Sequence, residues 1–138
     1  MIDFSTPQGK KAKAMIDREY IVWLTTVDAQ LRPQPRPVWF IWDNDSFLIY
    51  SQAKAFKVRH VEQHPAVALH FNADDQAEQD VVIFIGEAHI DPHAPQPDQS
   101  AAYMKKYASG IKDLGSTAEG FSGESSVAIR IKPLALRA

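Results

Sequence analysis

Residues 51–60 carry the side chains best suited to hold an anion. Lys54 and Lys57 lie three residues apart, and Arg59 and His60 follow them. The segment leaves a predicted strand, turns and starts a predicted helix, whose first N–H groups and positive dipole end favour an anion. Lysine supplies a compact charge and arginine a planar fork for phosphate. The pattern is compatible with a phosphate site, but a solvated cationic face on a surface helix is the simpler explanation from the residues alone.

Large flat side chains come from three tryptophans: Trp23, Trp39 and Trp42. A buried aromatic ring usually belongs to the core, but a planar cofactor also needs such walls. A hairpin around Asp43–Asp45 would bring residues 38–40, with Trp39 among them, near Tyr50 and Ser51. An apolar wall and a cationic anchor would then meet, an arrangement that suits a flat ring with a phosphate tail.

Other polar constellations have simpler explanations. His60 and His64 share a helical face, as metal-binding histidines do, but Glu62 lies on another face and no third ligand is evident, so we expect no metal site. Two carboxylate pairs fall in predicted turns, where aspartate is favoured for backbone reasons: Asp43/Asp45 and Asp74/Asp75.

The glycine- and serine-rich segment 110–126 carries no catalytic motif. Its stretch Gly120-Phe121-Ser122-Gly123 is not the elbow of a nucleophilic serine, and its glycines do not form a dinucleotide fingerprint. We expect a flexible loop, with a cofactor lid as the alternative. No catalytic residue is assigned from the sequence.

Composition excludes several classes of function. The 138 residues are typical of one domain (1–138), and a formal net charge of −2 gives no reason to expect a nucleic-acid partner. The absence of cysteine excludes disulfides, thiolate zinc sites, iron–sulfur clusters and a cysteine nucleophile. The N-terminal residues lack a secretory signal, and no apolar run approaches the ~20 residues of a membrane span. We expect a cytoplasmic protein without a membrane partner.

The hydrophobic pattern predicts three helices and about six strands. We place the helices at residues 8–19, 54–63 and 98–108, and the strands at 20–27, 31–42, 47–51, 67–71, 81–90 and 127–134. Both faces of Tyr20–Val27 are apolar, so we expect burial on both sides, against a helix or another subunit. Prolines at alternate positions 33, 35 and 37 indicate an edge strand. Antiparallel hairpins with few crossovers favour a mainly β protein, a small β-barrel with added helices.

Short motifs then run through the chain in a recognisable order. They are Arg36-Pro37-Val38-Trp39-Phe40, residues 43–47, Ile49-Tyr50-Ser51, residues 57–61, residues 64–69 and residues 82–88. In order and spacing they resemble the pyridoxamine 5′-phosphate oxidase-like, FMN-binding split-barrel superfamily. The C-terminal portion, from Tyr103 through residues 115–121 to Ile131, is similar to the subgroup described as F420-dependent. The resemblance covers about residues 20–133.

The resemblance implies a fold, a cofactor and a set of binding residues. The fold is a split β-barrel, and the assembly is a homodimer with FMN or coenzyme F420 at its interface. Lys57 and Arg59 would contact the cofactor phosphate, with Ser51 and Lys54 close by. The ring would lie along three residues, largely through backbone contacts: Val38, Trp39 and Phe40.

The implied chemistry is hydride transfer between the cofactor ring and a small organic substrate. The cofactor carries the difficult step, and the protein supplies orientation and electrostatics. One alternative is a non-catalytic module that binds or sequesters a flavin or deazaflavin; another is an interaction domain with a solvated basic helix. The longer arginine-rich segments of the true oxidase are not visible, so we do not expect pyridoxamine phosphate oxidation. His60 and His64 stand where the family more often has asparagine.

Overall fold

A computed structural model describes residues 2–73 and 81–138, and its strands form one antiparallel sheet in the order β2-β1-β5-β6-β7-β4-β3. The strands are β1 (Val22–Val27), β2 (Pro33–Val38), β3 (Ile41–Asp43), β4 (Ser46–Ser51), β5 (Ala66–His70), β6 (Ile83–Ile90) and β7 (Val127–Arg137). The Asp74/Asp75 pair, expected in a turn, lies outside the described residues.

The step from β2 to β3 determines the shape of the sheet. These strands are consecutive in the sequence, yet they form its two opposite edges. Only Trp39 and Phe40 separate them, and the three peptide steps from Val38 to Ile41 span at most about 10 Å. The sheet must therefore curl until its edges approach each other, which confirms the predicted mainly β, split-barrel fold.

The prediction of a single strand over residues 31–42 is wrong. The chain leaves one edge of the sheet after Val38 and joins the other edge at Ile41, so the segment forms two strands. The apolar run 38–42 continues through the bend without a turn residue, so the hydrophobic pattern does not reveal the crossing. The structure accordingly has seven strands in its described residues where about six were expected.

Helix α3 (Ala101–Asp113) supplies the polar partners that the crossing needs. The Tyr107 hydroxyl accepts a hydrogen bond from Phe40 N–H at 2.8 Å, and it can donate to the carbonyl of Tyr20 at 2.7 Å or of Phe40 at 2.9 Å. Lys106 Nζ donates to the Phe40 carbonyl at 2.9 Å and lies 3.6 Å from the centre of the Phe40 ring. Helix α3 thus fixes the position of Phe40, where the chain passes from one edge of the sheet to the other.

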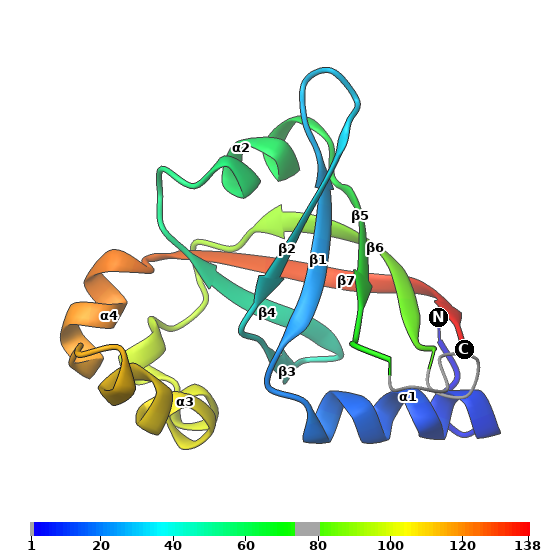
Figure 1. Ribbon diagram of the computed structural model, residues 1–138, viewed down its shortest axis with the longest axis horizontal. Coiled ribbons are helices and arrows are strands. Elements are labelled where there is room, and N and C mark those ends of the chain that lie inside the picture. Colours follow the sequence, from blue (N-terminus) through cyan, green and yellow to red (C-terminus); the bar gives the residue numbers. More distant parts are fainter. Residues whose placement is uncertain (1, 74–80) are drawn as a thin grey trace.

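Helices cover the two ends and one side of the sheet (Figure 1). They are α1 (Pro7–Arg18), α2 (Phe56–Gln63), α3 and α4 (Ala118–Glu124), with a short 3-10 helix η1 (Pro97–Gln99) before α3. α1 lies at one end of the barrel and α2 at the opposite end, while α3 and α4 lie together at one side. Pro7 is the first residue of α1, and the Thr6 hydroxyl caps the helix by accepting from Gly9 N–H.

The prediction of a flexible loop over residues 110–126 is wrong. α3 continues to Asp113, and Thr117 starts α4 by accepting a hydrogen bond from Gly120 N–H at 3.0 Å. Gly110 lies within α3, where a Cβ would be 3.1 Å from the ring of Trp39. This glycine permits a close helix contact and does not break the helix.

The predicted start of the third helix at residue 98 is also wrong. The Ser100 side chain accepts a hydrogen bond from Tyr103 N–H, so the α-helix begins at Ala101.

The prolines of β2 determine which of its side chains face the barrel interior. Proline has no N–H, so the ladder with β1 draws its donors from the alternate residues, and the edge prediction is confirmed. In this register three β1 residues with buried side chains are paired with three β2 residues. The pairs are Val22 with Val38, Leu24 with Arg36 and Thr26 with Gln34. Paired residues share a face, so the inner face of β2 carries the residues between the prolines.

The expectation that β1 is buried on both faces is wrong for a single chain. Val22, Leu24 and Thr26 are buried, whereas Trp23 and Thr25 on the outer face are only half-buried. No helix of the described residues covers that outer face enough to bury it.

We expect Tyr107→Phe to lower the free energy of unfolding by about 1–3 kcal/mol, because Phe40 N–H loses its acceptor in the core. Urea denaturation measures the change. Tyr20→Phe is the matched control, since the Tyr20 side chain is 58% exposed, and it should stay within about 0.5 kcal/mol of the parent protein. Equal stability of the two variants would contradict the role given to Tyr107.

Candidate functional site

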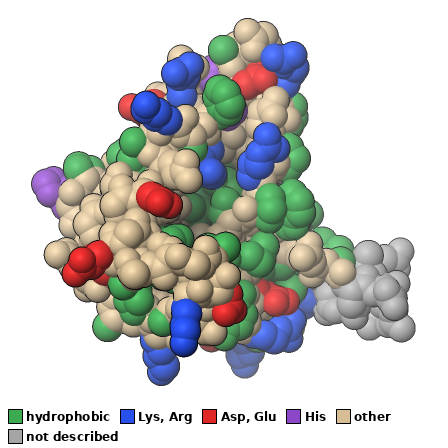
Figure 2. Space-filling view, turned by 60° about the vertical axis from the view of Figure 1, so that its left-hand side comes forward, with side chains coloured by type: hydrophobic (Ala, Val, Ile, Leu, Met, Phe, Trp, Pro, Cys, Tyr) green, Lys and Arg blue, Asp and Glu red, His purple; other side chains and the backbone are tan. Residues whose placement is uncertain are grey.

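A cleft of about 550 Å³ lies between the start of α2 and the β1–β2 hairpin. Its volume is within the range of about 300–1,000 Å³ that holds a whole small molecule. The hairpin contributes residues from Thr26 to Arg36, and α2 with its N-cap contributes residues from Ala55 to Gln63. Figure 2 shows a hollow on this side of the molecule, with Lys and Arg side chains beside it and hydrophobic side chains within it.

Three cationic side chains line this cleft: Arg36, Lys57 and Arg59. Burial lowers the pKa of Lys57, and the neighbouring charge of Arg36 lowers it further. Among the described residues, no carboxylate lies within 4.0 Å of any of the three. Ala55 provides no side-chain cap for α2, and Val58 N–H in the first turn donates to the Ala55 carbonyl at 3.2 Å. The cleft is therefore electropositive around these three side chains.

The hairpin end of the cleft is polar and held in place by Asp28. Its carboxylate accepts hydrogen bonds from the backbone N–H groups of Gln30 and Arg32, from Arg32 Nε at 3.1 Å and from Gln34 Nε2 at 3.0 Å. These bonds, first among them the one from Arg32 N–H, lower the pKa of Asp28. The side chain of Asp28 is 12% exposed, so this carboxylate is an internal anchor of the hairpin.

A second hollow of about 290 Å³ lies next along β2 and is aromatic. Val38 and Trp39 line it, with Tyr50 from β4 and Phe121 from α4. The Trp39 ring stacks on Tyr107 with centroids 4.6 Å apart and on Phe121 with centroids 5.6 Å apart. This stack fixes the plane of the Trp39 ring, so the hollow has a rigid flat wall.

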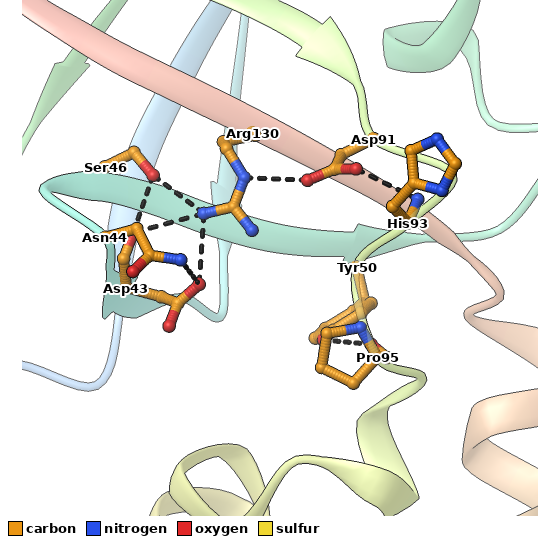
Figure 3. Close-up of polar contacts among 8 residues, drawn as sticks. All are labelled: Asp43, Asn44, Ser46, Tyr50, Asp91, His93, Pro95 and Arg130. Atoms are coloured by element: carbon orange, nitrogen blue, oxygen red, sulfur yellow. Dashed lines mark hydrogen bonds and ion pairs between the residues drawn. The ribbon is translucent and has the colours of Figure 1, made fainter.

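A third hollow of about 360 Å³ surrounds Arg130 on β7 (Figure 3). Arg130 Nε donates to Asp91 at 2.8 Å, and Nη1 donates to the Asp43 carboxylate at 3.1 Å and to the Ser46 hydroxyl at 2.9 Å. Asp43 therefore neutralises an internal charge and holds the predicted turn at residues 43–45 against β7. This cluster is structural, since its charged groups are already partnered.

Four of the seven predicted binding residues line the cationic cleft or the aromatic hollow. Lys57 and Arg59 line the cationic cleft. Val38 and Trp39 line the aromatic hollow together with Tyr50, the neighbour expected for them.

The other three predicted binding residues lie outside both hollows. Lys54 is exposed in the turn before α2, because the helix begins two residues later than predicted. Ser51 is buried and donates to the carbonyl of Gln52 at 3.2 Å. Phe40 is fully buried, and its backbone N–H and C=O are both engaged by α3.

The remaining candidates from the sequence have structural partners. His60 Nδ1 shares a hydrogen bond of 2.8 Å with the Thr26 hydroxyl, and the described residues contain no cluster of three metal ligands. Trp23 stacks on His70 on the outer face of the sheet, and Trp42 packs edge-on against Phe47 in the core.

Sequence reasoning did not assign Arg36, Gln34 or Phe121 to the site. The prolines at positions 33, 35 and 37 could have indicated Gln34 and Arg36. Side chains alternate along a strand, so the residues between the prolines share the opposite face. Phe121 was missed because its segment was predicted to be a loop. Its contact with Trp39 joins residues 82 positions apart, which periodicity does not reveal.

Comparison with known proteins identifies the fold. The family model described as pyridoxamine 5′-phosphate oxidase matches residues 9–138. No curated protein matches the sequence.

Several solved structures have a similar fold. An F420 reductase is 22% identical, with a TM-score of 0.68 over 91% of this chain and 94% of that one. The heme storage protein HutZ from Vibrio cholerae is 20% identical, with a TM-score of 0.64 over 94% and 92%. An FAD-binding protein from Mesorhizobium loti is 12% identical, with a TM-score of 0.67 over 92% and 90%. These proteins are named for different ligands, so the fold alone does not identify the ligand of this chain.

We expect Asp28→Asn to lower the urea midpoint at pH 7. The folded-state pKa of Asp28 is below its ordinary value, so ionised Asp28 adds stability above that value. The contribution is lost as the pH falls through the lowered pKa, and the two proteins should then converge. Glu87→Gln, at an exposed position on β6, should follow the parent protein throughout. A difference that persists unchanged into acid would contradict the electrostatic role of Asp28.

Proposed function

Since this chain belongs to the pyridoxamine 5′-phosphate oxidase family, we propose that it binds FMN or coenzyme F420 and transfers a hydride between that cofactor and a small organic substrate. One observation carries the proposal: a cluster of three cations and a rigid aromatic wall lie next to each other along the inner face of β2. A flavin or deazaflavin has the matching parts, a phosphate joined to a planar ring by a flexible chain.

The cationic cleft is the proposed phosphate subsite. Lys57 and Arg59 come from α2 and Arg36 from β2, so a phosphate there would meet positive charge from both walls. The start of α2 has no side-chain cap, so its positive dipole end would also favour the phosphate. Lys54 lies in the turn before the helix and Ser51 at the end of β4, and we propose that both support this subsite from outside the cleft.

The aromatic hollow is the proposed ring subsite. Arg36 and Val38 are two residues apart on the inner face of β2, which separates the subsites by about 7 Å of strand. Trp39 is held flat by Tyr107 and Phe121, so the wall is organised before a ring binds. Phe40 sets the position of this wall from the core, through its bonds to α3.

The bound cofactor would supply hydride chemistry, and the residues of this chain would bind and orient it. The cations fix the tail, and the stacked aromatic wall excludes water from one side of the ring. No activity toward pyridoxamine phosphate is proposed, because the sequence lacks the longer arginine-rich segments of the true oxidase. The cytoplasm stays the predicted compartment, and no helix among the described residues is long and apolar enough to cross a membrane.

A binding or sequestering module without turnover is the second candidate. It is favoured by the lining of the cleft, where the ring nitrogen Nδ1 of His60 is engaged by Thr26 and the Asp28 carboxylate by the hairpin. A steady-state hydride-transfer assay with bound cofactor separates the two candidates, since a sequestering module binds tightly and shows no turnover.

A homodimer with the cofactor at its interface is part of the proposal. The outer face of β1, β5 and β6 carries side chains that are only partly covered, among them Trp23, Thr25, Ala68, Ile83 and Ile85. Their strands are in register, so these side chains form one continuous patch. A second copy would bury the face that the sequence predicted to be buried.

We expect Lys57→Ala combined with Arg59→Ala to weaken cofactor binding tenfold or more, on the order of 1.5–3 kcal/mol for lost charged hydrogen bonds. Fluorescence titration with FMN and with F420 measures the change. Lys10→Ala combined with Arg18→Ala removes the same charge from exposed positions on α1 and should leave the affinity unchanged. Unchanged affinity in the Lys57→Ala, Arg59→Ala variant would contradict the assignment of the phosphate subsite to the cationic cleft.

We also expect sedimentation at micromolar concentration to show a dimer. Ile85 is 40% exposed in the single chain, so Ile85→Glu should shift the protein toward the monomer by placing a charge in the apolar interface. Lys112→Glu, at an exposed position on α3, should leave the dimer intact. A parent protein that sediments as a monomer would contradict the proposed assembly.

A further inference from the structure

Two large apolar side chains are exposed at the end of the barrel where the cationic cleft opens. Leu31, in the loop of the β1–β2 hairpin, is 70% exposed, and Phe56, the first residue of α2, is 75% exposed. No other large hydrophobic side chain of the described residues is as exposed. The hairpin and α2 lie together at this end (Figure 1), and Phe56 and Gln30, the neighbour of Leu31, line opposite walls of the cleft.

The backbone of Leu31 has a conformation that leucine rarely adopts. Its φ is 62°, in the left-handed region that favours glycine. The turn is held in place, since Leu31 N–H donates to the Asp28 carbonyl at 2.9 Å and Asp28 N–H donates to the Arg32 carbonyl at 3.1 Å. The leucine side chain gains no burial within the chain in return for this strain. Glycine would suit the turn better, so the leucine favours a contact made outside the chain.

Positive charge surrounds these two apolar side chains. Residues 28–36 and 54–63 carry five lysines and arginines against two carboxylates, whereas the whole chain has a formal net charge of −2. Four of these cations are exposed: Arg32, Arg36, Lys54 and Arg59. Arg32 and Lys54 lie outside the lining of the cleft, so they can meet an external anion even when the cleft holds one. This end of the barrel therefore attracts a partner with a negative surface.

We infer that this end of the barrel docks on an anionic lipid membrane, with Leu31 and Phe56 inserted at the headgroup boundary and the surrounding cations against lipid phosphates. Apolar insertion and attraction to anionic headgroups add at a membrane surface. The cleft separates the two apolar side chains, so they form no continuous apolar surface for a folded protein partner. A headgroup layer accepts separate side chains, and charge complementarity therefore favours lipid.

This contact is independent of the other proposals. Neither Leu31 nor Phe56 is assigned to the cofactor, and the contact does not use the outer face of β1, β5 and β6 proposed for a second copy. The expectation of no membrane partner rested on the absence of a spanning segment and of a secretory signal. A peripheral contact requires neither. Its two apolar side chains are far apart in the sequence, so no local pattern reveals them.

Vesicle sedimentation with the full chain tests the inference. One set of vesicles contains equal parts of phosphatidylcholine and phosphatidylglycerol, and the other contains phosphatidylcholine alone. We expect the anionic vesicles to bind the protein about tenfold more tightly or better. Leu31→Gly combined with Phe56→Gln should weaken that binding about tenfold, because both inserted side chains are lost. Leu114→Gln, which removes a similarly exposed leucine at the end of α3, is the matched control and should bind like the parent protein.

Leu31→Gly alone separates loss of docking from loss of the fold. Glycine accepts the φ of residue 31, so the urea midpoint of this variant should equal or exceed that of the parent protein. Its affinity for anionic vesicles should nevertheless fall about threefold. The inference is overturned if the parent protein binds neither set of vesicles or binds both equally. It is also overturned if the Leu31 variants bind like the parent protein, or if polyglutamate captures a protein that ignores the vesicles, which would indicate an acidic protein partner.

Discussion

The two-residue link between β2 and β3 is the constraint on which the rest of the structure depends. Because Trp39 and Phe40 alone connect strands at opposite edges, the sheet has to curl into a barrel. The same link leaves backbone polar groups in the core with no neighbouring strand. Tyr107 and Lys106 bond those groups at Phe40, and this fixes α3 beside the crossing. The aromatic wall is therefore a consequence of how the barrel closes.

The binding surface follows from the same strand. The prolines of β2 face away from the barrel, so its inner face presents Gln34, Arg36 and Val38 in a row. The row thus runs from a polar residue through a cationic one to an apolar one. Lys57 and Arg59 of α2 line the same cleft as Arg36. Like charges held together without a carboxylate lower stability unless an anion joins them. The three cations that line the cleft therefore favour the binding of an anion there.

The sequence predicted most of the elements and half of the site. Alternating prolines predicted an edge strand, and the basic residues Lys57 and Arg59 were found because charge spacing on a helix is a local property. The crossing at Phe40 was missed because its partners come from α3, more than 60 residues away. The helix α4 was missed because its glycines indicated a loop, whereas the Thr117 cap and the packing of Phe121 on Trp39 stabilise it. Long-range contacts supplied what local patterns could not.

The central claim is that one ligand occupies the cationic cleft and the aromatic hollow together. The most direct test follows tryptophan emission in a Trp23→Phe, Trp42→Phe variant, which keeps Trp39 as its only tryptophan. FMN and F420 are titrated with and without inorganic phosphate. The account predicts saturable quenching of Trp39 and a higher half-saturation concentration when phosphate competes for the cations. Saturable binding that leaves Trp39 emission unchanged, or that phosphate does not weaken, would contradict it.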